Sequence, residues 1–182
     1  ENIDRSIKKA TGELGAENFE EVMYEGYGPG GVAVLCEALT DNRNRTAGEL
    51  RKIFEVCGGN LGGSGCVSYL FSYKGLILVD SRLVAEDKLM EIAIEAGADD
   101  MQHDGDYHEI ICDPKAFDLV RQALDDHGIT AESAEIGYIP SNSIDLDVDN
   151  GKKMLKLLDL LEENEDVQNV FSNENIPAEA TA

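Results

Sequence analysis

The chain has 182 residues, a net charge of -22, 42% hydrophobic residues and no tryptophan. This length allows one large domain or two small ones, and the composition is that of an ordinary globular protein. No apolar run approaches the roughly 20 residues of a membrane-spanning helix, and no signal peptide is recognised, so neither a membrane protein nor a membrane partner is predicted.

The charge is distributed unevenly along the chain. Residues 1–73 hold 7 Lys+Arg and 11 Asp+Glu, net -4, whereas residues 74–182 hold 8 and 26, net -18. Because carboxylates repel phosphate backbones, the second half is a poor ligand for nucleic acid. Any contact with a polyanion is therefore expected from the first half or from what precedes it.

The N-terminal part is expected to hold a helix, a hairpin and a second helix. Ile3 and Ile7, four residues apart, predict a helix within residues 1–15, which is interpreted as the tail of an N-terminal domain. Residues 19–28 and 31–40 alternate like two strands around a Pro-Gly-Gly turn. Thr46, followed by Glu49, predicts a capping box for a helix that ends at Gly58.

The rest of the chain predicts three more helices and seven strands. The helices are expected at 85–96, 113–127 and 149–164. The strands are expected at 65–73, 75–80, 99–103, 107–112, 134–140, 142–147 and 167–171. Without the first hairpin strand, the order is βαββαβ twice, and each half resembles the split βαβ of ferredoxin-like folds.

These elements can be divided in series or nested, and the nested division is preferred. A serial cut would sever the tight hairpin at Asp104-Gly105, where domains do not usually part. The prediction is an α+β protein of two ferredoxin-like domains, one inserted into the other. Its parts are the end of an N-terminal helical domain (1–15), a discontinuous first α/β domain (16–73 and 141–173), an inserted acidic α/β domain (74–140) and a disordered tail (174–182).

No pattern is typical of a catalytic or metal centre, so neither an enzyme nor a cofactor is predicted. The four cysteines form no C-x-x-C pair, which indicates free thiols in a reducing compartment. His103 and His108 flank the Asp104-Gly105-Asp106 turn, where a solvated hairpin tip explains them as well as a surface metal site would. No nucleophile and base stand at a recognisable spacing.

Two glycine-rich stretches lack the context of a phosphate loop. Residues 26–31 (GYGPGG) lead into a strand, and residues 58–65 (GGNLGGSG) are followed by neither a helix nor a lysine. A plain turn and a flexible connection are the default interpretations. Alternatively, Tyr27 presents its ring for stacking on a base or a protein surface, and the second loop brings its backbone close to a partner.

The most distinctive stretch is residues 39–52 (LTDNRNRTAGELRK), which contains four of the fifteen basic residues. Cations at a helix start oppose the macrodipole, so local stability does not explain them, whereas arginines beside helix N-terminal amides would bind phosphate. Pairing with the protein's own acids is the alternative. The candidate residues for binding nucleic acid or the ribosome are Arg43 and Arg45 before the helix, Arg51 and Lys52 within it, and Asn42, Asn44, Thr46 and Tyr27.

Four segments together resemble the YebC/PmpR family over nearly the whole chain: residues 24–54, 58–71, 93–100 and 157–173. The resemblance implies a basic N-terminal helical domain followed by two α/β domains, one interrupting the other. It also implies a functional surface shared by the turn residues Tyr27, Gly28, Pro29, Gly30 and Gly31 and the stretch of Asn42, Arg43, Asn44, Arg45 and Thr46.

The same resemblance implies a non-enzymatic regulator of gene expression. Family members are described as DNA-binding transcriptional regulators or as ribosome-associated translation factors, so DNA or ribosomal RNA is the expected partner, bound chiefly by the basic domain. The charge favours the ribosome, because a long duplex would repel an acidic body. An acidic interaction module that docks on a basic partner is the alternative. A cytoplasmic monomer is expected, or a mitochondrial or plastid location if an import leader precedes residue 1.

Overall fold

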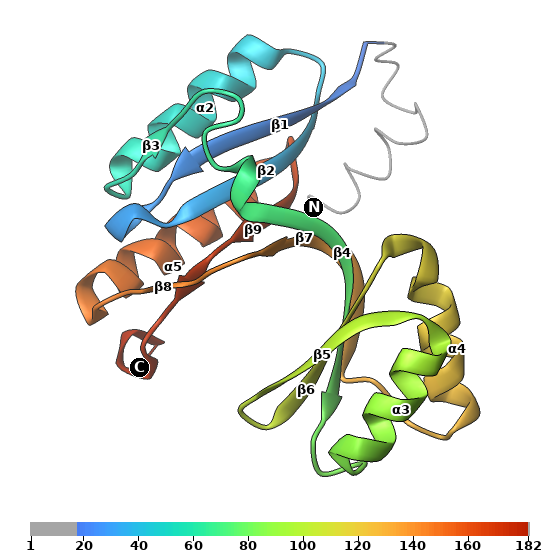
Figure 1. Cartoon of the computed structure of the whole chain (residues 1–182). Helices are drawn as coiled ribbons and strands as arrows, with labels where there is room; N and C mark the ends of the chain where they lie inside the picture. Colours follow the sequence, from blue (N-terminus) through green and yellow to red (C-terminus); the bar gives the residue numbers. More distant parts are fainter. Residues whose placement is uncertain (1–17, 182) are drawn as a thin grey trace. The chain divides into compact units, whose positions relative to one another are not determined.

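The computed structural model describes residues 18–181, so the helix predicted within residues 1–15 lies outside the described residues. The described residues form two compact units, one made of residues 18–71 and 140–181 and the other of Ser72–Ile139 (Figure 1). Each unit has an antiparallel sheet and two helices, and the predicted α+β class is confirmed. Within residues 18–181 no helix combines the length and apolar character needed to cross a membrane.

The first unit contains a four-stranded sheet in the order β3-β1-β2-β9. Its elements are β1 (Glu20–Tyr27), β2 (Ala33–Thr40), α2 (Arg43–Val56), β3 (Asn60–Leu61), α5 (Val148–Glu163) and β9 (Val167–Ser172). β1 and β2 form the predicted hairpin, with Tyr27 opposite Ala33 and Glu20 opposite Thr40. β2 also pairs with β9, so a strand from near the end of the chain forms the edge of the sheet beside β2.

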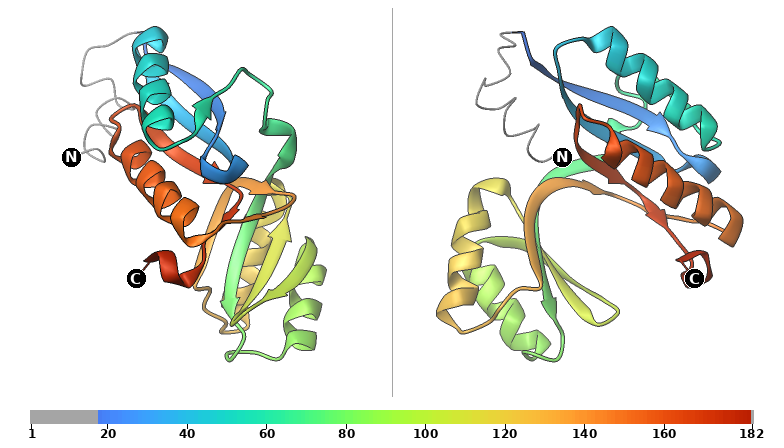
Figure 2. Two further views of the ribbon diagram at one scale, coloured as in Figure 1. Left: turned by 90° about the vertical axis from the view of Figure 1, so that its left-hand side faces the viewer. Right: turned by 180° about the vertical axis from the view of Figure 1, so that it is seen from behind.

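One face of this sheet is covered by α2 and α5 (Figure 2). Alternation along β2 turns Val34 and Cys36 towards the helices. Leu50 and Phe54, four residues apart on α2, are fully buried against them. α5 contributes a matching apolar stripe of Met154, Leu157 and Leu161.

The second unit is a βαββαβ arrangement with the strand order β5-β6-β4-β7. Its elements are β4 (Phe71–Asp80), α3 (Glu86–Ala96), β5 (Ala98–Asp104), β6 (Tyr107–Cys112), α4 (Phe117–Asp126) and β7 (Ser133–Pro140). Its own core joins Ile77 and Ile110 of the sheet to Leu89 of α3 and Leu124 of α4. This order is that of the ferredoxin-like fold.

Two predicted strands of the first unit do not enter its sheet. Residues 65–70 form turns, because the N–H groups of Gly65, Val67 and Ser68 bind the Glu25 side chain instead of a strand. β4 then runs without a break from Phe71 to Asp80, so the predicted domain boundary between residues 73 and 74 lies inside a strand. Residues 142–147 form only the two-residue β8 (Ile144–Asp145). β1, which was left out of the predicted βαββαβ order, instead belongs to the sheet and pairs with β2.

The tail is also more ordered than predicted. Its residues form β10 (Glu174–Asn175), which pairs in parallel with β8, and a 3₁₀ turn at Ala178–Thr181. Ala180 is only 5% exposed. A Cβ built on Gly151 of α5 would lie 2.9 Å from the Ala180 Cβ, so two small residues allow this close packing. The prediction of disorder for 174–182 was therefore wrong for its described part.

Candidate functional site

The basic stretch folds into the start of α2, one residue after a cap that the sequence analysis missed. Asn42 is the N-cap, and its side-chain Oδ1 accepts a hydrogen bond from the Arg45 N–H at 3.0 Å. The capping box predicted at Thr46 was wrong, because the Thr46 hydroxyl lies inside the helix and donates to Asp166 Oδ2 at 2.8 Å. Arg43 and Arg45 consequently lie in the first helical turn and not on the preceding loop.

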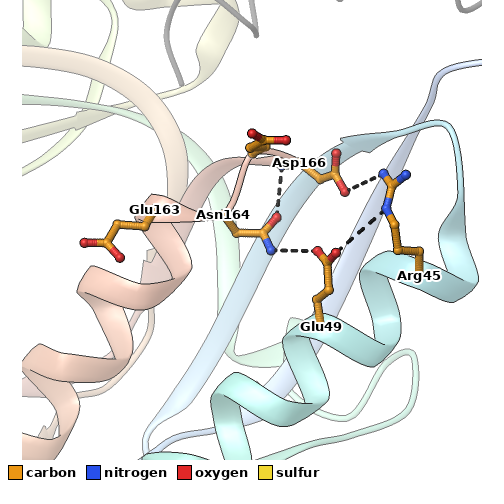
Figure 3. Close-up of a pocket in the computed structure, with 6 residues that line it drawn as sticks. Arg45, Glu49, Glu163, Asn164 and Asp166 are labelled. Atoms are coloured by element: carbon orange, nitrogen blue, oxygen red, sulfur yellow. Dashed lines mark hydrogen bonds and ion pairs between the residues drawn. The ribbon is translucent and has the colours of Figure 1, made fainter. Parts of the chain in front are cut away.

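Arg45 is held by the protein's own carboxylates (Figure 3). Its Nη2 donates to Asp166 Oδ2 at 2.9 Å and to Asp41 Oδ1 at 3.0 Å, and its Nε lies 3.9 Å from Glu49 Oε1. The hydrogen bond that Arg45 donates to Asp166 raises the pKa of Arg45. Asp166 itself is 3% exposed, whereas the Arg45 side chain is 41% exposed, so the guanidinium lies at the surface beside a buried acid. Arg45 therefore helps to fix the start of α2, and internal carboxylates compete with any phosphate for its guanidinium.

The other predicted cations are more accessible. The Arg43 side chain is 62% exposed, and its Nε lies 3.6 Å from Glu20 Oε1. Such an exposed pair is worth little. Arg51, Lys52 and Asn44 are exposed on α2, and neither Arg51 nor Lys52 has a recorded ion pair within residues 18–181. The structure thus separates one arginine paired with several carboxylates from three cations that have a weak ion pair or none among residues 18–181.

A cavity of ≈ 410 Å³ adjoins Arg45 between the start of α2 and the end of α5. It is lined by Arg45, Glu49, Glu163, Asn164, Glu165 and Asp166. The Asn164 Nδ2 donates to Glu49 Oε2 at 3.0 Å, which ties the two helices together (Figure 3). Four carboxylates against one guanidinium give this cavity a negative field, so it disfavours phosphate at the place where the sequence predicted phosphate binding.

The glycine turn lies at the other end of the hairpin. Pro29–Gly31 form a 3₁₀ turn that packs on the beginning of α5. A Cβ on Gly28 would lie 2.9 Å from Met154 Sδ, and one on Gly30, whose φ is +75°, would lie 2.6 Å from Leu146 Cδ2. These glycines allow the turn to pack closely on its neighbours.

The turn and the basic stretch do not form one surface along the hairpin. Strands of eight residues separate the turn from Asn42, a span of roughly 23 Å at about 3.3 Å per residue. The half-buried Tyr27 is engaged as well, because its hydroxyl donates to the Cys66 carbonyl at 3.2 Å. The structure thus brings Asn42, Arg45 and Thr46 together, whereas Tyr27 lies at the other end of the hairpin.

Glu25 is an important residue that the sequence analysis missed. Its side chain, 5% exposed, accepts N–H bonds from Gly65 at 2.6 Å, Val67 at 3.1 Å and Ser68 at 2.7 Å. Burial alone would raise the pKa of Glu25, but these bonds outweigh it and the pKa lies below its ordinary value. The second glycine-rich stretch therefore surrounds an internal carboxylate. In the sequence, the only feature that could have indicated this role was an acidic residue among the apolar residues of a predicted strand.

The described residues contain no assembled reactive centre. Burial raises the pKa of all four thiols, and that of Cys36 reaches about 12, so none is an activated nucleophile. Within residues 18–181 no three His, Cys, Asp or Glu side chains are grouped to hold a metal ion. His103 and His108 face each other across β5 and β6, with their Nδ1 atoms 3.4 Å apart.

Fold and site together define an acidic α+β protein with two ferredoxin-like units, in which the most distinctive polar cluster fixes a helix start. The family model described as the second and third domain of TACO1/YebC matches residues 19–174. The chain belongs to this family, and the resemblance seen in the sequence is confirmed.

Curated relatives and a solved structure agree with this assignment. A "Probable transcriptional regulatory protein" of Syntrophus aciditrophicus is 54% identical over 180 residues, which cover 98% of this chain and 72% of that protein. A protein of the same description from Geobacter sulfurreducens is 54% identical over 179 residues, with the same shares covered. The crystal structure of a conserved hypothetical protein from Aquifex aeolicus is 49% identical, with a TM-score of 0.74, and covers 96% of this chain and 72% of that one.

Proposed function

We propose that this chain is part of a non-enzymatic regulator of gene expression that acts on the ribosome and contacts RNA through the helix layer of its first unit. Relatives at about half identity carry the description of transcriptional regulatory proteins, which supports a regulatory role. Neither an activated thiol nor a metal cluster occurs within residues 18–181, which accords with a role in binding.

The observation that carries this proposal is the contrast between the two helix layers. α2 and α5 carry seven basic and six acidic residues, net +1. α3 and α4 carry two basic and seven acidic residues, net -5. In a chain of net charge -22, the helix layer of the first unit is therefore the face that best tolerates a polyanion.

Ribosomal RNA suits this distribution better than duplex DNA does. A long duplex presents phosphates along its whole length and would repel a strongly acidic body. A ribosome instead presents local RNA phosphates together with basic protein surfaces. The second unit, with five basic and sixteen acidic residues in Ser72–Ile139, is complementary to such protein surfaces.

Sedimentation tests the proposal directly. The chain is centrifuged with bacterial 70S ribosomes through a sucrose cushion, and its binding to a promoter-length DNA duplex is titrated in the same buffer over a salt series. Recovery with the ribosomes and weak, salt-sensitive DNA binding are expected. A chain that stays in the supernatant while binding the duplex tightly would support the DNA-binding alternative and overturn the proposal.

A further inference from the structure

We propose that Lys52 of α2 together with Lys153 and Lys156 of α5, here called the lysine strip, forms a binding site for the phosphate groups of folded RNA. The inference rests on the proposed function and deepens it by naming the contact surface. It also moves that surface away from the start of α2, where Arg45 is already held by carboxylates.

The packing of α2 against α5 brings the lysines of α5 beside the end of α2, and Lys52 lies in that half of α2. At one end of the pair, Asn164, which follows α5, bonds to Glu49 in the second turn of α2. At the other end, the Lys153 Cδ lies 3.9 Å from the position of a Cβ on Gly58, just beyond α2. The helices are therefore antiparallel, and the C-terminal half of α2 lies beside the N-terminal half of α5 (Figure 2).

Electrostatics gives independent evidence that Lys156 belongs to this group. Burial raises the pKa of the Cys57 thiol at the end of α2, and the charge of Lys156 partly opposes that rise. An ammonium on α5 is therefore close enough to act on the end of α2.

The charge order along α5 is not one that helix stability favours. Its N-terminal half carries Lys152 and Lys153, and Lys156 lies at its middle, whereas Asp159, Glu162 and Glu163 follow towards its C-terminus. The helix macrodipole favours acids near the N-terminus and cations near the C-terminus. This effect acts in the first and last turns, where Asp149 follows the rule and Glu162 and Glu163 oppose it. The lysines lie between these turns, so the macrodipole does not account for their position.

The lysine strip is open to a ligand, and it has fewer carboxylate partners than Arg45 has. Lys52, Lys153 and Lys156 are all exposed. Lys153 lies 3.5 Å from Asp149, but the two side chains are 52% and 84% exposed, so the pair is weak and easily exchanged for a phosphate. The acidic cavity at the other end of the same helix pair repels phosphate. An RNA backbone is thereby attracted to one half of the helix layer only.

Lysines bind phosphate as flexible point charges and read no base edges. The strip should therefore bind RNA with little dependence on sequence and strong dependence on salt. This is the behaviour expected of a protein that recognises a folded RNA surface by the placement of its phosphates.

Charge reversal in the full chain tests the strip. Lys153→Glu/Lys156→Glu changes two strip residues, and Lys88→Glu/Lys115→Glu makes the same change of charge in the second unit. Each chain is titrated with a fluorescein-labelled RNA stem-loop over a salt series and sedimented with 70S ribosomes. The strip variant is expected to lose about tenfold or more in RNA affinity, and its salt slope should fall by about 1.5. The control should lose less than about twofold.

The outcomes separate the two proposals. Equal losses in both variants would assign the effect to total charge and overturn the strip, while ribosome binding by the parent chain would still support the proposed function. A parent that binds neither ribosomes nor the stem-loop overturns both. Lys153→Gln/Lys156→Gln, with an unchanged thermal midpoint, should show an intermediate loss. Stronger competition by duplex DNA than by the stem-loop would overturn the assignment to RNA.

Discussion

At the scale of single residues, buried carboxylates organise the first unit. Asp166 receives hydrogen bonds from Arg45 and Thr46, and Glu25 receives three from the loop before β4. Each binds donors that would otherwise be free to meet an external anion. The two most distinctive motifs of the sequence are therefore explained largely by internal anions.

Removing the charge of Asp166 should loosen the start of α2. Asp166→Asn is expected to lower the free energy of unfolding by about 2 kcal/mol, because an amide replaces an ionised acceptor facing Arg45 and Thr46. Urea denaturation measures the change. Glu163→Gln, at an exposed position on the same cavity, is the control and should stay within about 0.5 kcal/mol of the parent. Equal effects would contradict the role given to Asp166.

Glu25 should make stability depend on pH in the acid range. Its folded pKa is lowered, so its contribution is complete above the ordinary value of 4.5 and is lost as the pH falls towards the folded pKa. Glu25→Gln is expected to cost about 2 kcal/mol at pH 7. The difference from the parent should shrink below about pH 4.5. Denaturation midpoints from pH 7 to pH 3 test this, and a constant difference would refute it.

At the scale of elements, local patterns predicted most of the helices and strands. The hairpin, α3 and α5 follow from periodicity and end signals that lie within each segment. The start of α2 was missed because Asn42 and Thr46 are both acceptable caps. The choice between them depends on Asp166, which is far away in the sequence.

The candidate site was only partly predictable for the same reason. The sequence correctly placed four cations at or near one helix. It could not show that Arg45 forms ion pairs with Asp41 and Asp166. Nor could it place Lys153 and Lys156 beside α2, because that neighbourhood arises from the antiparallel packing of two helices. Both features depend on contacts between residues far apart in the sequence, which local sequence patterns do not predict.

In the loop that follows α2, alanine should be tolerated at Gly63 and not at Gly59. A Cβ on Gly59 would overlap the backbone oxygen of Tyr27, whereas a Cβ on Gly63 meets nothing within 4 Å. Gly59→Ala is therefore expected to destabilise the protein by about 2 kcal/mol or more, because backbone must shift. Gly63→Ala should be nearly neutral. Thermal melting compares the two, and a harmless Gly59→Ala would contradict the packing described.

At the scale of the whole molecule, the two units have separate hydrophobic cores. The core of the second unit draws its buried residues from positions 77–129 alone, and that of the first unit includes none of them. Residues 72–139 expressed alone should consequently fold and unfold cooperatively. Urea denaturation followed by circular dichroism measures this. A broad transition without a baseline would show that this unit depends on the other.

The return of β9 to β2 has a consequence for the order in which the molecule forms during its synthesis. Val34 must wait for its partner Ser172, whereas every strand of the second unit has already emerged by then. The first and last strands of the inserted unit, β4 and β7, are neighbours in its sheet, and the residues just outside it are also joined, since the Ser141 N–H donates to the Leu70 carbonyl at 2.8 Å. Once folded, the inserted unit shortens the effective loop that the nascent chain must close to complete the first sheet. Early folding of the inserted unit should therefore favour pairing between the segments on either side of it.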